Sequence, residues 1–369
     1  MNSRFIRNVI LKGLILFLLI DLCFAAVAPA ALGKVSLYNR LFTGRQRFPF
    51  GEDSTQSYNL SLFNLDAMFA SHVIDSGPKP ADEYRVIVIG DSSTWGTLLR
   101  PEETLAGQLD TAGLSICGKT LRVYNLGYPT ISLTKDLMVL DYALRYQPDL
   151  VIWLVSLEAF PVDKQLSSPI VANNAARVDE LIARYNLPLN LNDPALVRPG
   201  FWDSTLISQR RPLADLFRLQ MYGMLWTATG IDQTYPVDYQ RAQTDFDTDI
   251  TFHNMQPPTL DESQLAFGLL EAGLRIAGGT PLILINEPML VSAGENRELR
   301  YNFLYPRWAY DQWREMMLVR AEVGGWNYLD LWNIVPAEEF TNSAIHLTPA
   351  GESLLTKRVE QTILQQSCP

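Results

Sequence analysis

The first regular feature along the chain is a run of apolar residues at 13–32, which follows a short basic segment at 1–12. A helix of this length spans about 30 Å, the thickness of the hydrocarbon core of a membrane. Arg4, Arg7 and Lys12 precede the run. Because positive charge stays on the cytoplasmic side, the N-terminus is expected in the cytoplasm and the bulk of the chain outside. We therefore predict a transmembrane signal anchor at 13–32.

Asp21 interrupts this run, and a carboxyl group at the middle of a membrane helix costs about 2.5–3.5 kcal/mol to insert. A cleavable signal peptide is the alternative, because the small residues at 26–31 offer cleavage sites. Lipoprotein processing at Cys23 would need a better recognition sequence than the one present. Each of these readings exports the rest of the chain, where Cys117 and Cys368 form either a disulfide or two free thiols.

Short apolar segments alternate with helical patterns from residue 84 onward. Each segment is apolar throughout, which is typical of strands in a parallel sheet that is covered on both faces. The predicted strands are 84–90, 121–127, 149–156, 281–288 and 326–332, and the predicted helices are 101–115, 131–146, 307–322 and a last one that begins near Pro349. This alternation predicts an α/β domain.

Two stretches lie outside the alternation. Residues 33–83 contain turn signals and no long periodic segment, so we interpret them as a juxtamembrane connector that packs onto the domain. Residues 161–278 are rich in Pro and Asn and are interpreted as an insertion or cap, which leaves 84–160 and 279–369 for the α/β domain itself. Inside the insertion, 212–231 is apolar but carries two charges, which favours a core or interfacial helix over a second span.

Charge and composition narrow the function classes. The 369 residues include 40 Asp and Glu against 30 Lys and Arg, for a net charge of −10. This acidic chain lacks the basic surface that a nucleic-acid-binding protein needs. Its 3 cysteines and 3 histidines show no metal-ligand spacing. We therefore expect no nucleic-acid partner, no metal and no cofactor.

The sharpest chemical signal is VIVIGDSSTWG, at 86–96. A strand ends there at a Gly-Asp pair, and Ser92 follows where the next helix begins, a place that suits a nucleophile because it offers unpaired N–H groups. The same pattern also fits a serine that only caps the helix. The second signal is FTNSAIHLTPAG, at 340–351, which puts His346 before the last helix and at the same sheet edge as Ser92. His346 is therefore a candidate general base.

Together the two segments resemble the nucleophile and histidine blocks of the SGNH/GDSL-type esterase and acyltransferase superfamily. The resemblance implies a three-layer α/β/α fold with a parallel five-stranded, flavodoxin-like sheet, with Ser92 as nucleophile and His346 as its base. The glycine block of the family corresponds to VYNLGYPT, so the resemblance implies that the Gly127 N–H joins that of Ser92 as an oxyanion donor. It covers residues 84–160 and 281–366 and leaves the middle of the chain unexplained.

Two positions depart from the family pattern. Glu158 stands where the family has an Asn that donates to the oxyanion, and loss of one such donor costs about 2.7–4 kcal/mol. Ser343 stands where the family has the Asp that orients the histidine. The candidates for the missing donor are Asn125, Asn173 and Asn286, and those for the missing orienting group are Asn342, Ser343, Asp330, Glu287 and Glu158.

The resemblance and the export signal together imply a membrane-anchored serine esterase or O-acyltransferase that acts on acyl esters of a cell-surface glycan or on a related small ester. The expected partners are this substrate, the lipid bilayer around residues 13–32, and a membrane acyl-donor protein. The alternative is a catalytically degenerate SGNH-like domain that binds a glycan or a membrane partner, which the two altered blocks favour. Metal-assisted hydrolysis through Asp91, Glu158 and Glu287 has no ligand spacing to support it.

Overall fold

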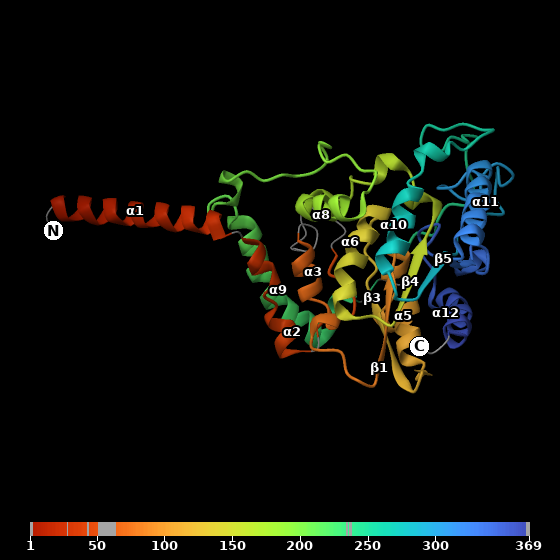
Figure 1. Ribbon diagram of the computed structural model, residues 1–369, viewed down its shortest axis with the longest axis horizontal. Coiled ribbons are helices and arrows are strands. Elements are labelled where there is room, and N and C mark those ends of the chain that lie inside the picture. The colour runs from red at the N-terminus through yellow and green to blue at the C-terminus, as the bar shows by residue number, and fades with distance from the viewer. Residues whose placement is uncertain are drawn as a thin grey trace.

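The computed structural model describes residues 3–27, 29–42, 44–50, 64–233, 235 and 238–366. An α/β domain carries a long N-terminal helix, α1 (Ser3–Val27), which projects away from the domain (Figure 1). By length and composition α1 is the one described helix able to cross a membrane. Cys23 on α1 is a free thiol, whereas Cys117 is disulfide-bonded. Cys368, the partner considered for it, lies outside the described residues.

The sheet has six strands in the order β2-β3-β1-β4-β5-β6. Five of them run parallel, and the short β2 pairs antiparallel with β3. Their bounds are β1 (Glu83–Ile89), β2 (Ser115–Ile116), β3 (Lys119–Asn125), β4 (Leu150–Val155), β5 (Leu282–Asn286) and β6 (Asn327–Asp330). The parallel strands follow the flavodoxin-like order, so the predicted five-stranded parallel sheet is confirmed, with one short strand added at its edge.

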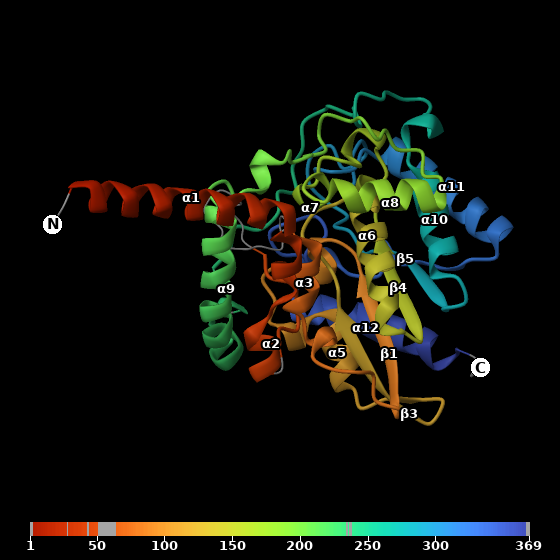
Figure 2. The ribbon, with the colours of Figure 1, turned by 60° about the vertical axis from the view of Figure 1, so that its left-hand side comes forward.

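Helices cover both faces of the sheet, as the buried strands require. One face packs against α6 (Leu133–Ala143), α8 (Ala175–Tyr185), α10 (Phe267–Ala277) and α11 (Arg307–Gly324), and the other against α5 (Leu105–Thr111) and α12 (Pro349–Leu364). Successive β1 residues alternate between the two cores: Ile87 faces the first and Val88 the second. The three predicted layers are therefore present, and Figures 1 and 2 show them from two sides.

Short elements connect these layers. The remaining α-helices are α2 (Leu37–Leu41), α3 (Leu65–Ala70), α4 (Ser92–Trp95), α7 (Pro169–Ala172) and α9 (Arg210–Thr229). The 3-10 turns are η1 (Pro29–Lys34), η3 (Val73–Asp75), η4 (Pro101–Glu103), η5 (Leu144–Tyr146), η6 (Leu157–Ala159), η7 (Val162–Lys164), η8 (Trp202–Ser204), η9 (Ile231–Gln233), η10 (Glu262–Gln264) and η11 (Ala337–Glu339).

The end of the insertion needs a correction. We assigned 161–278 to it, but α10 at the end of this range is the crossover helix between the neighbouring parallel strands β4 and β5. Gly273 of α10 lies against the Trp153 ring, so the helix is packed into the sheet's own core. A parallel connection needs such a crossover, which makes α10 part of the α/β domain. The insertion therefore ends before Phe267.

Candidate active site

Ser92 opens the short helix α4 directly after β1. Asp91 is the residue that caps this helix, because its Oδ1 accepts the N–H of Ser93 at 2.8 Å. Gly90 is required before it, since a Cβ there would lie 2.1 Å from the Thr94 Oγ1. Because Asp91 caps the helix, the Ser92 hydroxyl is not needed as a cap, and it lies half-buried at the carboxyl edge of the sheet.

The Ser92 hydroxyl meets the histidine across this edge. Ser92 Oγ lies 2.8 Å from His346 Nε2, and the other ring nitrogen, Nδ1, lies 2.8 Å from Asn342 Oδ1. An amide oxygen can only accept, so Nδ1 carries the proton and Nε2 accepts the hydroxyl hydrogen of Ser92. This is the tautomer that a general base needs. The expected orienting carboxylate is replaced by the amide of Asn342.

The histidine is held neutral. Burial lowers the pKa of His346 to about 4, and the nearby charge of Asp91 only partly opposes this shift. At neutral pH the imidazole is therefore unprotonated and able to take a proton from Ser92. The loop that carries it closes on itself, because Thr341 N–H donates to the His346 carbonyl at 2.8 Å.

A buried lysine supports the nucleophile turn from below. Lys135 Nζ donates to the Gly90 carbonyl at 2.6 Å and pairs with Asp136 at 2.5 Å, and both side chains are almost completely buried. Trp153 Nε1 also donates to Asp136. Burial raises the pKa of Asp136, against the opposing effect of Lys135. Our sequence reasoning missed this pair, although a Lys-Asp dipeptide in an otherwise apolar stretch of α6 is the signal that marks it.

The segment before the domain also reaches the nucleophile turn. Arg47 Nη1 donates to the carbonyl oxygens of Trp95 (3.1 Å) and Gly96 (2.8 Å), and its guanidinium lies 4.3 Å from the centre of the Trp95 ring. Trp95 Nε1 in turn donates to the Phe48 carbonyl. His72 Nε2 lies 3.0 Å from the Asn125 carbonyl at the end of β3. The connector is thus a structural support of the site, which its irregular pattern did not indicate.

The expected oxyanion donors are placed differently from our expectation. The Gly127 N–H already donates to Asn125 Oδ1 at 3.0 Å, and Asn125 Nδ2 donates to the Thr94 carbonyl at 2.7 Å. An Asn side chain readily bonds the backbone two residues on, which explains why it takes this N–H. The assignment of Gly127 and Asn125 as donors is therefore corrected: they brace the turn. Within the described residues the Ser92 N–H has no acceptor, so it is available to an oxyanion.

The other candidate amides are also engaged. Asn173 Nδ2 donates to the Pro169 carbonyl at 2.9 Å, and Asn286 Nδ2 donates to Asp330 Oδ1 at 2.7 Å. Asp330 itself pairs with Arg314 at 2.5 Å, so it does not orient His346. Ser343 forms no hydrogen bond within the described part of the chain. Of the orienting groups considered, Asn342 is the one that contacts the histidine.

Glu287 is a buried acid that does not contact His346 either. Ser93 Oγ donates to its carboxyl group, directly beside the nucleophile. Burial, followed by the charge of Asp91, raises its pKa well above the ordinary value. Glu287 is therefore harder to ionise than an ordinary glutamate. No group of three or more His, Cys, Asp and Glu side chains that could hold a metal ion occurs among the described residues.

Glu158, which follows β4, is neutralised by cations. Lys164 Nζ lies 2.5 Å from its carboxylate, and His253 Nε2 lies 3.2 Å from it. Burial would raise the pKa of Glu158, but the hydrogen bond from His253 and the charge of Lys164 lower it overall. The same bond raises the pKa of His253. Glu158 is thus ionised and paired, and the idea that it orients His346 is wrong. His253 comes from the insertion, and sequence reasoning gave it no role.

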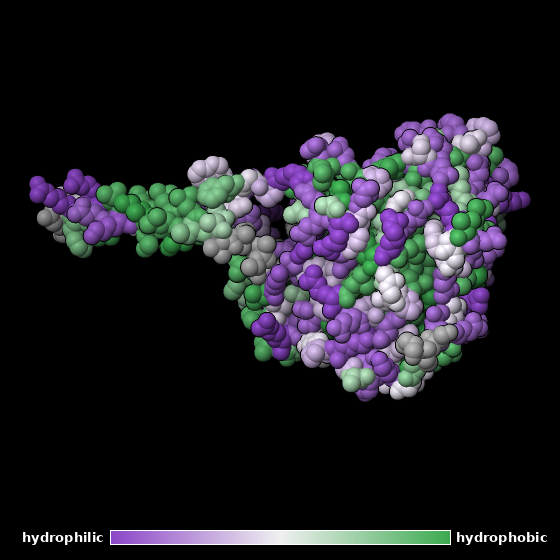
Figure 3. Space-filling model, in the orientation of Figure 1, coloured by the Kyte–Doolittle hydropathy of each residue, from purple (hydrophilic) through white to green (hydrophobic). Residues whose placement is uncertain are grey.

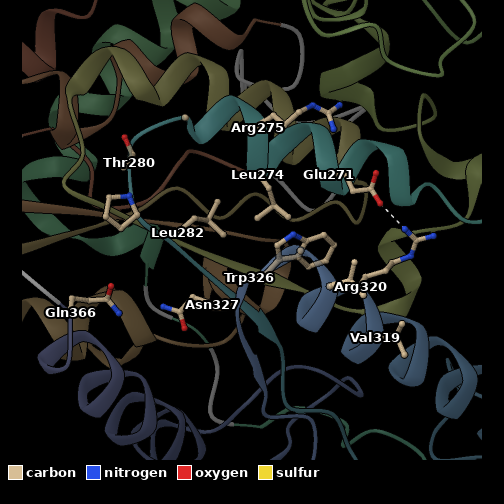
Figure 4. A pocket seen from close by; sticks show the side chains of 15 residues that line it. Glu271, Leu274, Arg275, Thr280, Leu282, Val319, Arg320, Trp326, Asn327 and Gln366 are labelled. Atoms are coloured by element: carbon tan, nitrogen blue, oxygen red, sulfur yellow. Dashed lines mark hydrogen bonds and ion pairs between the residues drawn. The ribbon is translucent and has the colours of Figure 1, made fainter.

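A separate cleft of about 800 Å³ opens at the amino ends of β5 and β6, whereas Ser92 lies at the carboxyl edge (Figure 4). Trp326 lies at its centre, with Arg320 and Arg275 at the sides, and Arg320 pairs with Glu271. None of the residues of the Ser92–His346 contact lines this cleft. We therefore assign the chemistry to the sheet edge and not to the cleft.

Comparisons with known proteins were made for the whole chain. Neither a scan against protein-family models nor a search of curated proteins returned a match. Similar solved structures include a lipolytic protein of the G-D-S-L family from Veillonella parvula, with 10% identity and a TM-score of 0.36 over 76% of this chain and 99% of that one. A GDSL-like lipase from Bacteroides thetaiotaomicron has 11% identity and a TM-score of 0.36 over 78% and 91%. A catalytic mutant of an acetylxylan esterase from Geobacillus stearothermophilus has 14% identity and a TM-score of 0.36 over 77% and 95%.

Likeness at this level adds nothing about activity, which has to be judged from the site. The fold is evident from the chain's own topology: five parallel strands in flavodoxin-like order, with Ser92 directly after β1 and His346 directly before α12. With its helices on both faces of the sheet, the chain has the three-layer α/β/α, flavodoxin-like fold that the sequence resemblance implied.

Proposed function

We propose that this protein is an exported, membrane-anchored serine esterase or O-acyltransferase that acts on acyl esters of a cell-surface glycan. The observation that carries the proposal is the Ser92–His346–Asn342 chain of contacts, with a neutral histidine whose Nε2 faces the hydroxyl. Nucleophile, base and orienting group are then in the order that acyl transfer requires. Export by α1 would put this site in the compartment where surface glycans are found.

The chemistry follows from these contacts. Ser92 Oγ attacks the acyl carbonyl carbon while His346 Nε2 takes the hydroxyl proton, which gives a tetrahedral oxyanion and an imidazolium. The intermediate collapses to an acyl-serine, and the imidazolium returns its proton to the departing alcohol. Water then attacks the acyl-serine in an esterase, or a sugar hydroxyl does so in a transferase, with His346 again as base. Asn342 Oδ1 keeps the ring in place by accepting a hydrogen bond from Nδ1–H in every state.

The carboxylate that stands in place of the missing donor is held in ion pairs. The Ser92 N–H is one donor to the oxyanion, and Glu158 stands where the family has a second. Lys164 and His253 both contact this carboxylate, and His253 also lies 3.4 Å from Asp163, so two cationic groups balance two carboxylates when His253 is protonated. β4 is the direct neighbour of β1, which bears Ser92. We infer that the ion pairs prevent Glu158 from opposing the developing negative charge.

Contacts at the end of α1 favour an anchor that stays attached. Asp21 is buried, and its Oδ1 accepts the Ile207 N–H at 2.9 Å. The carboxyl group therefore lies against the domain, which removes the cost of placing it at mid-membrane. Cleavage at 26–31 would remove this partner and leave the Ile207 N–H without its acceptor. This supports retention of the helix over a cleaved signal peptide.

The test is a fluorophosphonate probe applied to the full-length protein in detergent or nanodiscs. Labelling is expected for the native protein and for Ser93→Ala, the matched control, because Ser93 faces Glu287 and not the histidine. Ser92→Ala should lose the label completely, and His346→Ala should react at least about 10²-fold more slowly. A folded native protein that takes no label, or a Ser92→Ala variant that keeps it, would refute the proposal.

A second candidate is a non-catalytic domain that binds a glycan or a membrane partner. The observation that favours it is the engagement of the Gly127 N–H by Asn125, which leaves one backbone donor where the family uses more. Glu158→Asn separates the two readings with a chromogenic acetate as substrate. A gain of activity would indicate a decayed site that the amide repairs. A loss would indicate that the Glu158–Lys164–His253 cluster takes part in the reaction.

A further inference from the structure

Helix α9 has one face packed on the domain and the opposite face bare. Its inner face carries Leu219, Gln220 and Gly223, all buried. Gln220 Oε1 accepts the Leu37 N–H of α2 at 2.7 Å, and a Cβ on Gly223 would lie 2.6 Å from the Tyr38 ring. The helix is therefore fixed in position by close contacts to α2, and its outer face is a permanent surface of the domain.

This outer face is apolar. Phe217, Met221 and Leu225 follow each other at helical spacing and are 67%, 54% and 59% exposed. Leu41 at the end of α2 and Trp202 in η8 extend the surface, at 69% and 71% exposure. We call these five side chains the apolar face. Figure 3 shows hydrophobic surface on this side of the domain, below the root of α1. Exposed patches of this kind mark interaction sites.

The apolar face adjoins the expected membrane span. α1 packs against η8, and Asp21 of α1 holds the Ile207 N–H just before α9 begins. In both ribbon views α9 runs across the direction of α1 and not along it (Figures 1 and 2). If the part of α1 before Asp21 crosses the bilayer, α9 therefore runs along the bilayer surface, at the depth where α1 leaves the lipid.

The charges around the face suit lipid headgroups. Arg210 and Arg211 begin α9, and Arg218 borders the apolar stripe, where it pairs with Asp215 at 3.3 Å. Arg40 is an exposed residue of α2, the helix that packs against α9. An otherwise acidic protein thus concentrates arginine beside its apolar face. Cationic residues that flank an apolar stripe are typical of helices that lie in the membrane interface, because anionic lipids attract them.

We propose that α9 is an interfacial helix that lies in the outer headgroup region of the membrane that α1 crosses, with the apolar face against the acyl chains. The proposal rests on the membrane anchoring stated above. A helix of this kind inserts about 5–10 Å into the boundary between headgroups and acyl chains. With α1 it fixes the domain to the bilayer at two places, so the domain keeps one orientation toward the membrane. Lipid is favoured over a protein partner because the face continues directly from the span.

The experiment places a fluorescent label at single cysteines in the full-length protein, with Cys23→Ser as background and the disulfide of Cys117 left intact. An environment-sensitive nitrobenzoxadiazole dye is attached to Met221→Cys or Leu225→Cys. Leu16→Cys in α1 is the control for the span, and Val323→Cys, 85% exposed on α11, is the control for solvent. The protein is reconstituted in vesicles of phosphatidylethanolamine and phosphatidylglycerol that contain nitroxide-bearing lipids.

A nitroxide near the headgroup should quench the dye at positions 221 and 225, with a blue shift of its emission, and should leave position 323 unaffected. A nitroxide deep in the acyl chains should quench position 16. Quenching at position 16 without quenching at positions 221 and 225 would overturn the proposal for α9 but would still support insertion of α1 into the membrane. Absence of quenching at 16 would refute the anchor and the proposal with it. Positions 221 and 225 shielded in native membranes but unquenched by lipid would show a protein partner instead. Fluorophosphonate labelling of the same samples reports on the active site separately.

Discussion

Asn342 is the most informative residue to change, because it alone decides which nitrogen of His346 carries the proton. Its Oδ1 accepts from Nδ1 at 2.8 Å and it is exposed, so substitution leaves the core untouched. Asn342→Asp puts a carboxylate on Nδ1, as in a complete Ser-His-Asp triad. Asn342→Leu has a similar size and removes the acceptor. Both variants are expected to fold like the native protein.

The size of the effect follows from the strength of the hydrogen bond. A neutral bond contributes about 1 kcal/mol and one to a charged group about 1.5–3 kcal/mol, of which solvent at this exposed position screens a part. In Asn342→Asp the imidazolium of His346 is stabilised by about 0.7–1 kcal/mol net. This raises the pKa of His346 by about 0.5–0.7 and raises kcat about 3–5-fold over the native protein. Asn342→Leu should lower kcat about 5-fold, because water replaces the lost acceptor imperfectly.

The assay is kcat/KM for a chromogenic ester between pH 3.5 and 8. Activity needs neutral His346, so it is lost as the pH falls through the pKa of His346, which burial lowers to about 4. Asn342→Asp should shift the acidic fall in kcat/KM to higher pH and should raise the maximal kcat/KM near neutral pH. Asn342→Leu should lower the maximal kcat/KM near neutral pH. An Asp variant that slows the reaction without shifting this acidic fall, or a Leu variant with native kinetics, would show that residue 342 does not orient the base.

Three further changes test the supports around the site. Burial raises the pKa of Glu352 to about 8. The free energy of unfolding should therefore fall by about 1.4 kcal/mol per pH unit as the pH rises from 4.5 to 8. Glu352→Gln should abolish this dependence when denaturant unfolding is compared at pH 5 and pH 8. Lys135→Met leaves Asp136 unpaired and should destabilise the fold by about 3–5 kcal/mol, whereas the double change with Asp136→Leu should recover much of this. Arg47→Met leaves the Gly96 carbonyl without its donor and should lower the free energy of unfolding by about 1–3 kcal/mol. It should also lower kcat, and Arg47→Lys should partly restore it. An unchanged kcat would mean that the turn after Ser92 keeps its shape without Arg47.

Much of the fold was predictable because its signals are local. Each parallel strand is a short run of apolar residues, and the strand–turn–helix sequence around Ser92 places the serine by itself. His346 could be placed at the same edge because the carboxyl ends of parallel strands share one edge. The predictions that rest on local sequence patterns, namely the parallel strands and their sheet, are therefore the ones that the strand order confirms.

The site's detailed bonding was not predictable, because it depends on side chains distant in sequence. Gly127 was named for its N–H, but the conformation of Asn125 decides whether that N–H is free. His253 and Glu158 are 95 residues apart, and the insertion between them has no regular pattern that fixes where His253 lies. Arg47 reads as one basic residue in an irregular segment, and its burial against Trp95 depends on the folded domain.

The contacts of Arg47 also explain why the connector is more than a tether. The nucleophile helix α4 has a single turn, and such a turn does not hold its shape without tertiary contacts. Lys135 fixes its beginning through the Gly90 carbonyl, and Arg47 fixes its end through the Trp95 and Gly96 carbonyls. The segment that follows α1 therefore supplies half of the support for the turn that carries Ser92. Because Arg47 lies between α1 and the domain, removing the segment before β1 together with α1 would loosen the turn that carries Ser92.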